Sequence, residues 1–144
     1  MEKMVQPNSR LQNLVVARYQ NGKTVKGVTY DFGPEKRGFH VTSTEGGKVS
    51  QVFFSELKAV FFVRSLAGSK DHSPPRKEFM EKEMEARGLV KVKITFFDGE
   101  VFLGTTNGYN PERKGFFISP LEQDSNNVRV YIITSAVKQI ETWK

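Results

Sequence analysis

Two stretches of this 144-residue chain decide the fold, because they repeat each other: residues 15–43 read VVARYQNGKTVKGVTYDFGPEKRGFHVTS, and residues 92–120 read VKITFFDGEVFLGTTNGYNPERKGFFISP. A constant offset of 77 residues aligns them. Self-similarity of this kind predicts two copies of one structural unit. The aligned positions include Gly22 with Gly99, Gly27 with Gly104, and PEKRGF at 34–39 with PERKGF at 111–116.

Each copy has the pattern of short β-strands. Val15, Ala17 and Tyr19 alternate with other residues, and this period of two is typical of a half-buried strand. Asn21-Gly22 follows that strand, as Asp98-Gly99 does in the second copy. Such pairs favour a two-residue hairpin turn, because both central residues adopt positive φ. The glycine five residues further on, inside the next strand, predicts a bulge or bend.

These patterns predict a mainly β protein with two tandem, five-stranded, antiparallel small β-barrels. The first barrel is expected over residues 11–65 and the second over 91–144, after a flexible N-terminus at 1–10. Residues 66–90 should form a linker with a helix at about 75–87, because helix formers follow Pro74-Pro75 and Gly88 can end the helix.

The repeated unit resembles the Sm-like small β-barrels. The residues that carry the resemblance are Gly22, Gly27, Asp31-Phe32 and the strand Phe39-His40-Val41. The resemblance implies a barrel with a strongly bent second strand. Members of that family contact RNA through an Asn after the Asp-aromatic pair and an Arg-Gly before the last strand. This chain lacks that Asn in its first copy and has Ser55-Glu56 and Thr134-Ser135 in place of Arg-Gly, so its RNA site should differ.

Composition limits the classes of function. The chain has a net charge of +6, and residues 1–65 contain ten Lys/Arg against five Asp/Glu, which favours an anionic partner. There is no Cys, and the two histidines, His40 and His72, stand apart, so we expect no catalytic residues, no metal and no cofactor. The apolar runs are too short to span a membrane, and no signal-peptide core is visible, so we expect a cytoplasmic protein without a membrane partner.

The leading hypothesis is a non-enzymatic module that binds RNA or another single-stranded nucleic acid. Basic side chains beside exposed aromatic rings suit phosphates and bases. The basic face of the first barrel should dominate, because Glu100 and Leu103 stand in the second copy where the first has lysines. The candidate residues are Lys23, Lys26, Tyr30, Lys36, Arg37, Lys48, Arg113 and Lys114.

Two other functions stay open. A regulatory adaptor or assembly module would bind a protein partner or a second copy of the chain. Leu14 and Val16 form an outward apolar strip that needs cover from the other barrel, the helix or a second chain, which favours a barrel–barrel or protein–protein interface. Phe79, Met80 and Met84 could share one face of the linker helix and add to that interface. The third hypothesis is a cyclic-dinucleotide receptor of the PilZ type, although the Arg-x-x-x-Arg motif of that type is absent.

Overall fold

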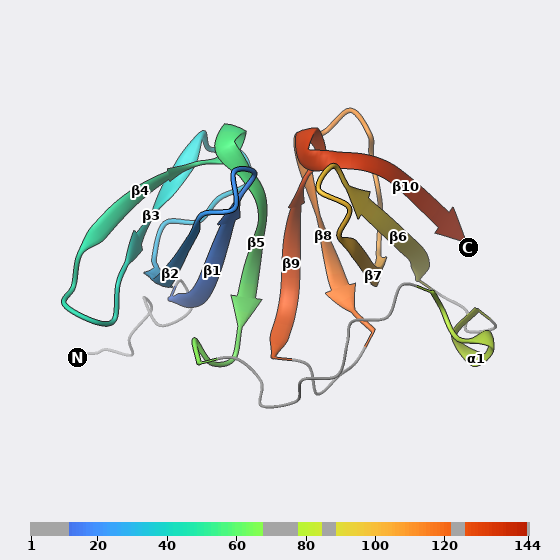
Figure 1. Cartoon of the computed structure of the whole chain (residues 1–144), viewed down its shortest axis with the longest axis horizontal. Coiled ribbons are helices and arrows are strands. Elements are labelled where there is room, and N and C mark those ends of the chain that lie inside the picture. Colours follow the sequence, from blue (N-terminus) through green and yellow to red (C-terminus); the bar gives the residue numbers. More distant parts are fainter. Residues whose placement is uncertain (1–11, 68–77, 85–88, 122–125, 144) are drawn as a thin grey trace, which may run out of the picture.

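The computed structural model describes residues 12–67, 78–84, 89–121 and 126–143, and most of them lie in β-strands or in the turns between strands (Figure 1). The strands are β1 (Asn13–Tyr19), β2 (Thr24–Thr29), β3 (Gly38–Thr42), β4 (Val49–Phe53), β5 (Leu57–Val63), β6 (Val90–Phe96), β7 (Val101–Thr106), β8 (Gly115–Pro120), β9 (Asn127–Ile133) and β10 (Val137–Trp143). Single 3-10 turns, η2 (Phe54–Glu56) and η3 (Thr134–Ala136), follow β4 and β9, and one short helix, α1 (Glu81–Met84), precedes β6.

All ten strands form one antiparallel sheet in the order β10-β6-β7-β8-β9-β5-β1-β2-β3-β4. The N-terminal half (β1–β5) and the C-terminal half (β6–β10) lie side by side in Figure 1 and are joined through β5 and β9. The prediction of a mainly β, antiparallel protein is confirmed. The sheet does not close on itself, however, because β10 and β4 stand at its two ends.

The two halves have the same strand order and the same register. Val15 pairs with Gly27 in the first hairpin, and Val92 pairs with Gly104 in the second. Both hairpins form where they were predicted, but the predicted two-residue turn is wrong. The Gly22 N–H donates to the Tyr19 carbonyl at 3.0 Å, and the Gly99 N–H donates to that of Phe96 at 2.9 Å, so each loop has three residues and ends with a glycine at a φ of 93° or 94°. The origin of the two halves from one copied unit stays a prediction. The equivalent strand pairing of the halves is consistent with it.

The glycine inside the second strand of each half allows a close approach of backbones. A Cβ atom on Gly27 would lie 2.2 Å from the carbonyl oxygen of Thr42 on β3, and one on Gly104 would lie 2.5 Å from that of Ser119 on β8. Both distances are too short for any side chain, so only glycine lets β2 and β7 meet the next strand at this point.

Two hydrophobic cores lie on opposite faces of β5 and β9. Alternate residues of a strand point to opposite faces, and both central strands supply residues to both cores. A strand buried on two faces reads as a continuous apolar run, which explains Ala59–Val63. Of the residues of β5 and β9, the N-terminal core contains Leu57, Val60, Phe62, Tyr131 and Ile133. The C-terminal core contains Ala59, Phe61, Val63, Val130 and Ile132.

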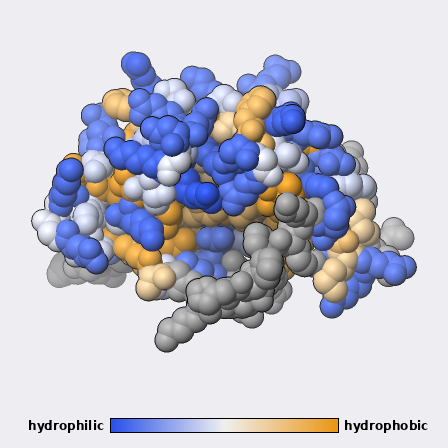
Figure 2. Space-filling model, in the orientation of Figure 1, coloured by the Kyte–Doolittle hydropathy of each residue, from blue (hydrophilic) through white to orange (hydrophobic). Residues whose placement is uncertain are grey.

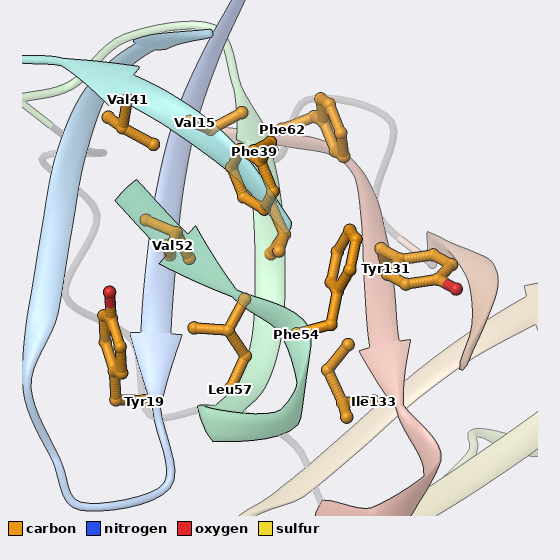
Figure 3. Packing of buried hydrophobic residues seen from close by; sticks show 12 residues of the cluster. Val15, Tyr19, Phe39, Val41, Val52, Phe54, Leu57, Phe62, Tyr131 and Ile133 are labelled. Atoms are coloured by element: carbon orange, nitrogen blue, oxygen red, sulfur yellow. The ribbon is translucent and has the colours of Figure 1, made fainter. Parts of the chain in front are cut away.

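Aromatic rings from both halves meet in the N-terminal core. Figure 3 shows Tyr131 and Ile133 of β9 beside Phe54 and Phe62 of the N-terminal half. Phe32 lies among them, with its ring centroid 4.9 Å from that of Phe62 and 5.5 Å from that of Tyr131, both edge to face. Such pairs stabilise the fold by about 0.5–1.5 kcal/mol beyond area burial. The C-terminal half thus helps to fill the core of the N-terminal half.

An ion network also joins the halves. Lys58 on β5 is only 4% exposed, and its ammonium binds Asp98, at 2.6 Å, and Glu100 of the β6–β7 hairpin. Arg18 on β1 reaches Glu100 as well, at 3.3 Å. The hydrogen bond from Lys58 is the main cause that lowers the pKa of Asp98. A buried ammonium requires such partners, so the network fixes the two halves against each other.

The linker is described only in part. Residues 81–84 form a single helical turn, and the rest of the helix predicted at 75–87 lies outside the described residues, as does the N-terminus at 1–10. Within the described ranges, no helix is long and apolar enough to cross a membrane. On the face shown in Figure 2, hydrophilic side chains cover most of the surface, and hydrophobic ones show mainly toward the centre and lower left.

Candidate functional site

The two basic turns line one concavity, although 77 residues separate them in the sequence. The turn between β2 and β3 contributes Lys36 and Arg37, and the turn between β7 and β8 contributes Arg113 and Lys114. Strands β8 and β9 supply much of the remaining lining. We call this hollow, of about 1200 Å³, the basic concavity; its cationic and aromatic lining residues are Lys36, Arg37, Tyr109, Arg113, Lys114, Phe116, Phe117, Arg129 and Tyr131.

Backbone hydrogen bonds hold both basic turns in the same way. The N–H of Lys36 donates to the carbonyl of Gly33 at 3.0 Å, and the N–H of Arg113 donates to that of Asn110 at 3.1 Å. The 3-10 turns then fasten the far end of each turn. Phe54 N–H donates to the Arg37 carbonyl at 3.0 Å, and Thr134 N–H donates to the Lys114 carbonyl at 2.9 Å.

The glycine that ends each basic turn has a steric cause. A Cβ atom on Gly38 would lie 2.2 Å from the carbonyl oxygen of Val52, and one on Gly115 would lie 2.5 Å from the Tyr131 ring. Neither position can accept a larger residue without moving the neighbouring strand. The sequence basic-basic-Gly therefore keeps the cations directly beside β4 and β9.

Positive charge exceeds negative charge around the concavity. Five cationic side chains line it, against the two carboxylates of Glu35 and Glu112. The ammonium of Lys36 donates to the backbone carbonyl of Asp31 at 3.1 Å, which holds this side chain near its turn. Burial raises the pKa of Tyr131, so its phenol stays protonated and can donate a hydrogen bond. The arrangement suits a ligand with several negative charges.

Asp31 and His40 form a pair beside the first basic turn. His40 Nδ1 lies 2.7 Å from Asp31 Oδ2, and the backbone N–H of His40 donates to Asp31 Oδ1 at 2.9 Å. Burial opposes ionisation of Asp31, but the hydrogen bonds from His40 and Thr29 outweigh it and lower the pKa of Asp31. The pair fixes the segment that leads into the turn. Across the described residues, no three His, Asp or Glu side chains converge as a metal site requires.

The other predicted nucleic-acid residues lie outside the basic concavity. Lys23 lines a separate, smaller hollow with Tyr19, Asn21 and Glu56, and its ammonium lies 5.4 Å from the centre of the Tyr19 ring. Lys26, Tyr30 and Lys48 are exposed and are absent from the lining of either hollow. The structure thus brings together four of the eight predicted residues: Lys36, Arg37, Arg113 and Lys114.

The predicted interface residues have different surroundings. Leu14 and Val16 are half-buried and pack against the C-terminal core, so the other half of the chain covers this apolar strip. Phe79 packs edge to face on Trp143, with ring centroids 5.4 Å apart. Met80 and Met84 are exposed.

Arg129 is the cation that the sequence patterns did not single out. It lies on β9, and its guanidinium lies over the rings of Phe62 and Phe117. No motif surrounds it, and Val49 occupies its equivalent place in the N-terminal half, so the repeat carries no signal for it.

Comparison with known proteins yields one match. Residues 11–144 match the model of a family described as a family of unknown function, DUF6982. No curated protein matches the chain, and no solved structure does.

Proposed function

The chain belongs to the DUF6982 family, and we propose that it binds single-stranded nucleic acid through the basic concavity without catalysing a reaction. The observation that carries this proposal is the meeting of two basic turns, 77 residues apart in the sequence, around one hollow. Repeated cations spread over separate faces would have indicated only a solvated surface.

The lining suits a charged, flat-sided polymer. Five cations can neutralise several phosphates, and release of the counterions gives binding that weakens steeply with salt. Tyr109 is half-buried in the same lining and offers a ring for base stacking. The volume of about 1200 Å³ exceeds the roughly 300–1,000 Å³ typical of small-molecule pockets. A segment of a polymer is therefore a better match than a single nucleotide.

The proposal includes an architecture for each half. We take each half as an open counterpart of a Sm-like small barrel, because both have the strand order fifth, first, second, third, fourth. The second strand approaches its neighbour too closely for any residue but glycine at one point, as a strongly bent strand does. Since Ser55-Glu56 and Thr134-Ser135 replace the Arg-Gly of that family, the cations come from the basic turns instead.

The test is the binding of a short fluorescent single-stranded RNA, followed by anisotropy at several salt concentrations. The logarithm of the affinity should fall linearly with the logarithm of the salt concentration, by roughly 0.7 per neutralised phosphate. The double variants Lys36→Glu/Arg37→Glu and Arg113→Glu/Lys114→Glu should weaken binding to a similar degree, because both turns line the concavity.

The matched control is Lys26→Glu/Lys48→Glu, which reverses two exposed cations of the N-terminal half outside the concavity. This variant has the same net charge as the two test variants, so it separates a local site from general charge attraction. Equal weakening by all three variants, or no binding at low salt, would overturn the proposal.

A further inference from the structure

Arg129 differs from the other four cations of the basic concavity in how it is held. Its guanidinium carbon lies 4.3 Å from the centre of the Phe62 ring and 4.6 Å from that of Phe117. The two ring centres are only 6.1 Å apart, so the guanidinium caps both rings from one side instead of lying between them. The two rings therefore cover part of the guanidinium, while the residue remains exposed and lines the concavity.

The hydrogen-bonding groups of Arg129 have no protein acceptor in the described part of the chain. No carboxylate there lies within ion-pair distance of its guanidinium, and no carbonyl accepts from it. Burial lowers the pKa of Arg129 from its ordinary value, so the charge has already lost part of its hydration. A partly desolvated guanidinium whose N–H donors have no acceptor among the described residues binds an oxyanion strongly, and its planar fork fits two oxygens at once.

The position of Arg129 is also fixed in advance. The residue belongs to β9, a central strand that pairs with β5 on one side and β8 on the other, and it stands directly opposite Phe62. Contact with two rings limits the rotamers of a long side chain. Less side-chain entropy is then lost on binding than for the turn cations, which project from exposed turns.

Among the residues that the structure describes, only Arg129 lies over two aromatic rings. The equivalents of Arg129, Phe117 and Phe62 are Val49, His40 and Thr142, because β4 corresponds to β9, β3 to β8 and β10 to β5. The open edges therefore cannot form a second site of this kind.

We infer that Arg129 is the phosphate anchor of the basic concavity: its guanidinium binds two oxygens of one phosphate group, while the turn cations attract the neighbouring charges. This inference rests on the proposed function for the source of the phosphate, a nucleic-acid backbone. Free inorganic phosphate offers the same chemistry, and it provides an independent arm of the test.

The variant that isolates the anchor is Arg129→Lys. It keeps the charge and most of the aliphatic stem but replaces the planar fork by a single ammonium. We expect about a tenfold loss of affinity for the labelled RNA, with the slope of affinity against salt unchanged, because the number of cations is unchanged. Arg64→Lys, the matched control, changes an exposed arginine that does not line the concavity, and it should change the affinity less than about twofold.

A merely structural Arg129 would only cover the aromatic rings, and a second measurement tests this. Inorganic phosphate should shift the Nε–H resonance of Arg129 in a nitrogen-15 NMR spectrum of the wild-type protein, and urea unfolding of Arg129→Lys should match the wild type. An Arg129→Lys protein that binds RNA as tightly as the wild type would overturn the anchor and leave the proposed function standing.

The two ideas fail in different ways. If the wild type binds no RNA but phosphate shifts the Arg129 resonance, the anchor stands and the nucleic-acid proposal falls. If phosphate does not shift the Arg129 resonance, and Arg129→Lys loses RNA affinity only together with a loss of folding stability, the anchor is wrong. Absence of both RNA binding and the phosphate shift overturns both.

Discussion

The junction between β5 and β9 and the open edges at β4 and β10 are built from equivalent strands but carry different side chains. At the junction, Phe62, Phe117 and Tyr131 form one aromatic cluster with ring centres 4.9–6.1 Å apart where they pair. Their equivalents at the open edges are Thr142, His40 and Gln51. Equivalent strands therefore carry packed aromatic rings at the β5–β9 junction and mostly polar side chains at the open edges.

The charges differ in the same sense. At the junction Lys58 meets Asp98 and Glu100, which are opposite charges. The equivalents at the ends are Lys138 for Lys58, and Asn21 and Lys23 for the two acids. A second chain placed edge to edge, in the manner of β5 and β9, would bring Lys138 near Lys23. Equivalent strands thus form one strong junction, while like charges disfavour its repetition between chains.

The largest effect should come from opening the aromatic cluster. Phe62→Ala should lower the free energy of unfolding by about 3–5 kcal/mol, because a ring that is 4% exposed leaves a cavity shared by both halves. Thr142→Ala, at the equivalent place in β10, should change it by less than about 0.5 kcal/mol. Urea denaturation followed by fluorescence measures both. Similar losses of unfolding free energy in Phe62→Ala and Thr142→Ala would show that the junction is no more important for stability than the open edge.

Local features of the fold could be predicted from sequence because they depend on neighbouring residues. Asn21-Gly22 and Asp98-Gly99 predicted the positions of both hairpins, and both glycines have positive φ, although each loop has three residues and not the predicted two. The outward apolar strip of Leu14 and Val16 predicted a covering surface, and both residues pack against the C-terminal core.

Features that depend on distant partners could not be predicted in this way. The burial of Lys58 requires Asp98 and Glu100, which are 40 and 42 residues away. The repeat predicted two self-contained closed barrels. In the structure β5 and β9 each supply residues to both cores, and the sheet is open, with β4 and β10 at its two ends. Alternation of apolar residues reports which positions are buried, and it cannot report which strand lies alongside.

The ion network should give the next largest effect. Asp98→Asn/Glu100→Gln would leave the buried ammonium of Lys58 without a carboxylate and lower the free energy of unfolding by about 2–3 kcal/mol. This lies below the ~3–5 kcal/mol of a fully buried pair, because Asp98 is half exposed and water can reach the site. Lys23→Gln, at the place equivalent to Glu100, is the control and should be near neutral. A loss of unfolding free energy under about 1 kcal/mol in the double variant would show that the ion network does not hold the two halves together.

A smaller effect should appear on acidification. Because the folded-state pKa of Asp98 is lowered, its ionised form stabilises the fold above its unfolded-state pKa of about 3.9, and this contribution is lost as the pH falls through the folded-state pKa. The stability difference between wild type and Asp98→Asn should therefore be full at pH 7 and shrink below about pH 4. Urea midpoints across this range measure it, with Glu45→Gln, an exposed turn residue, as control. A pH-independent difference would contradict the assigned role of the charge.

The weakest effect is expected from giving an open edge the side chains of the junction. Asn21→Asp, Lys23→Glu and Gln51→Tyr place on the N-terminal half the residues found at Asp98, Glu100 and Tyr131. Lys138 of a second chain could then meet two acids, and each new cross-strand pair contributes only about 0.2–1 kcal/mol. Sedimentation velocity should show a monomeric wild type and a mass that rises with concentration in the triple variant. Adding Lys138→Glu should restore the monomer, because it returns like charges to the edge; association of the wild type itself would show that the polar edges do not prevent pairing.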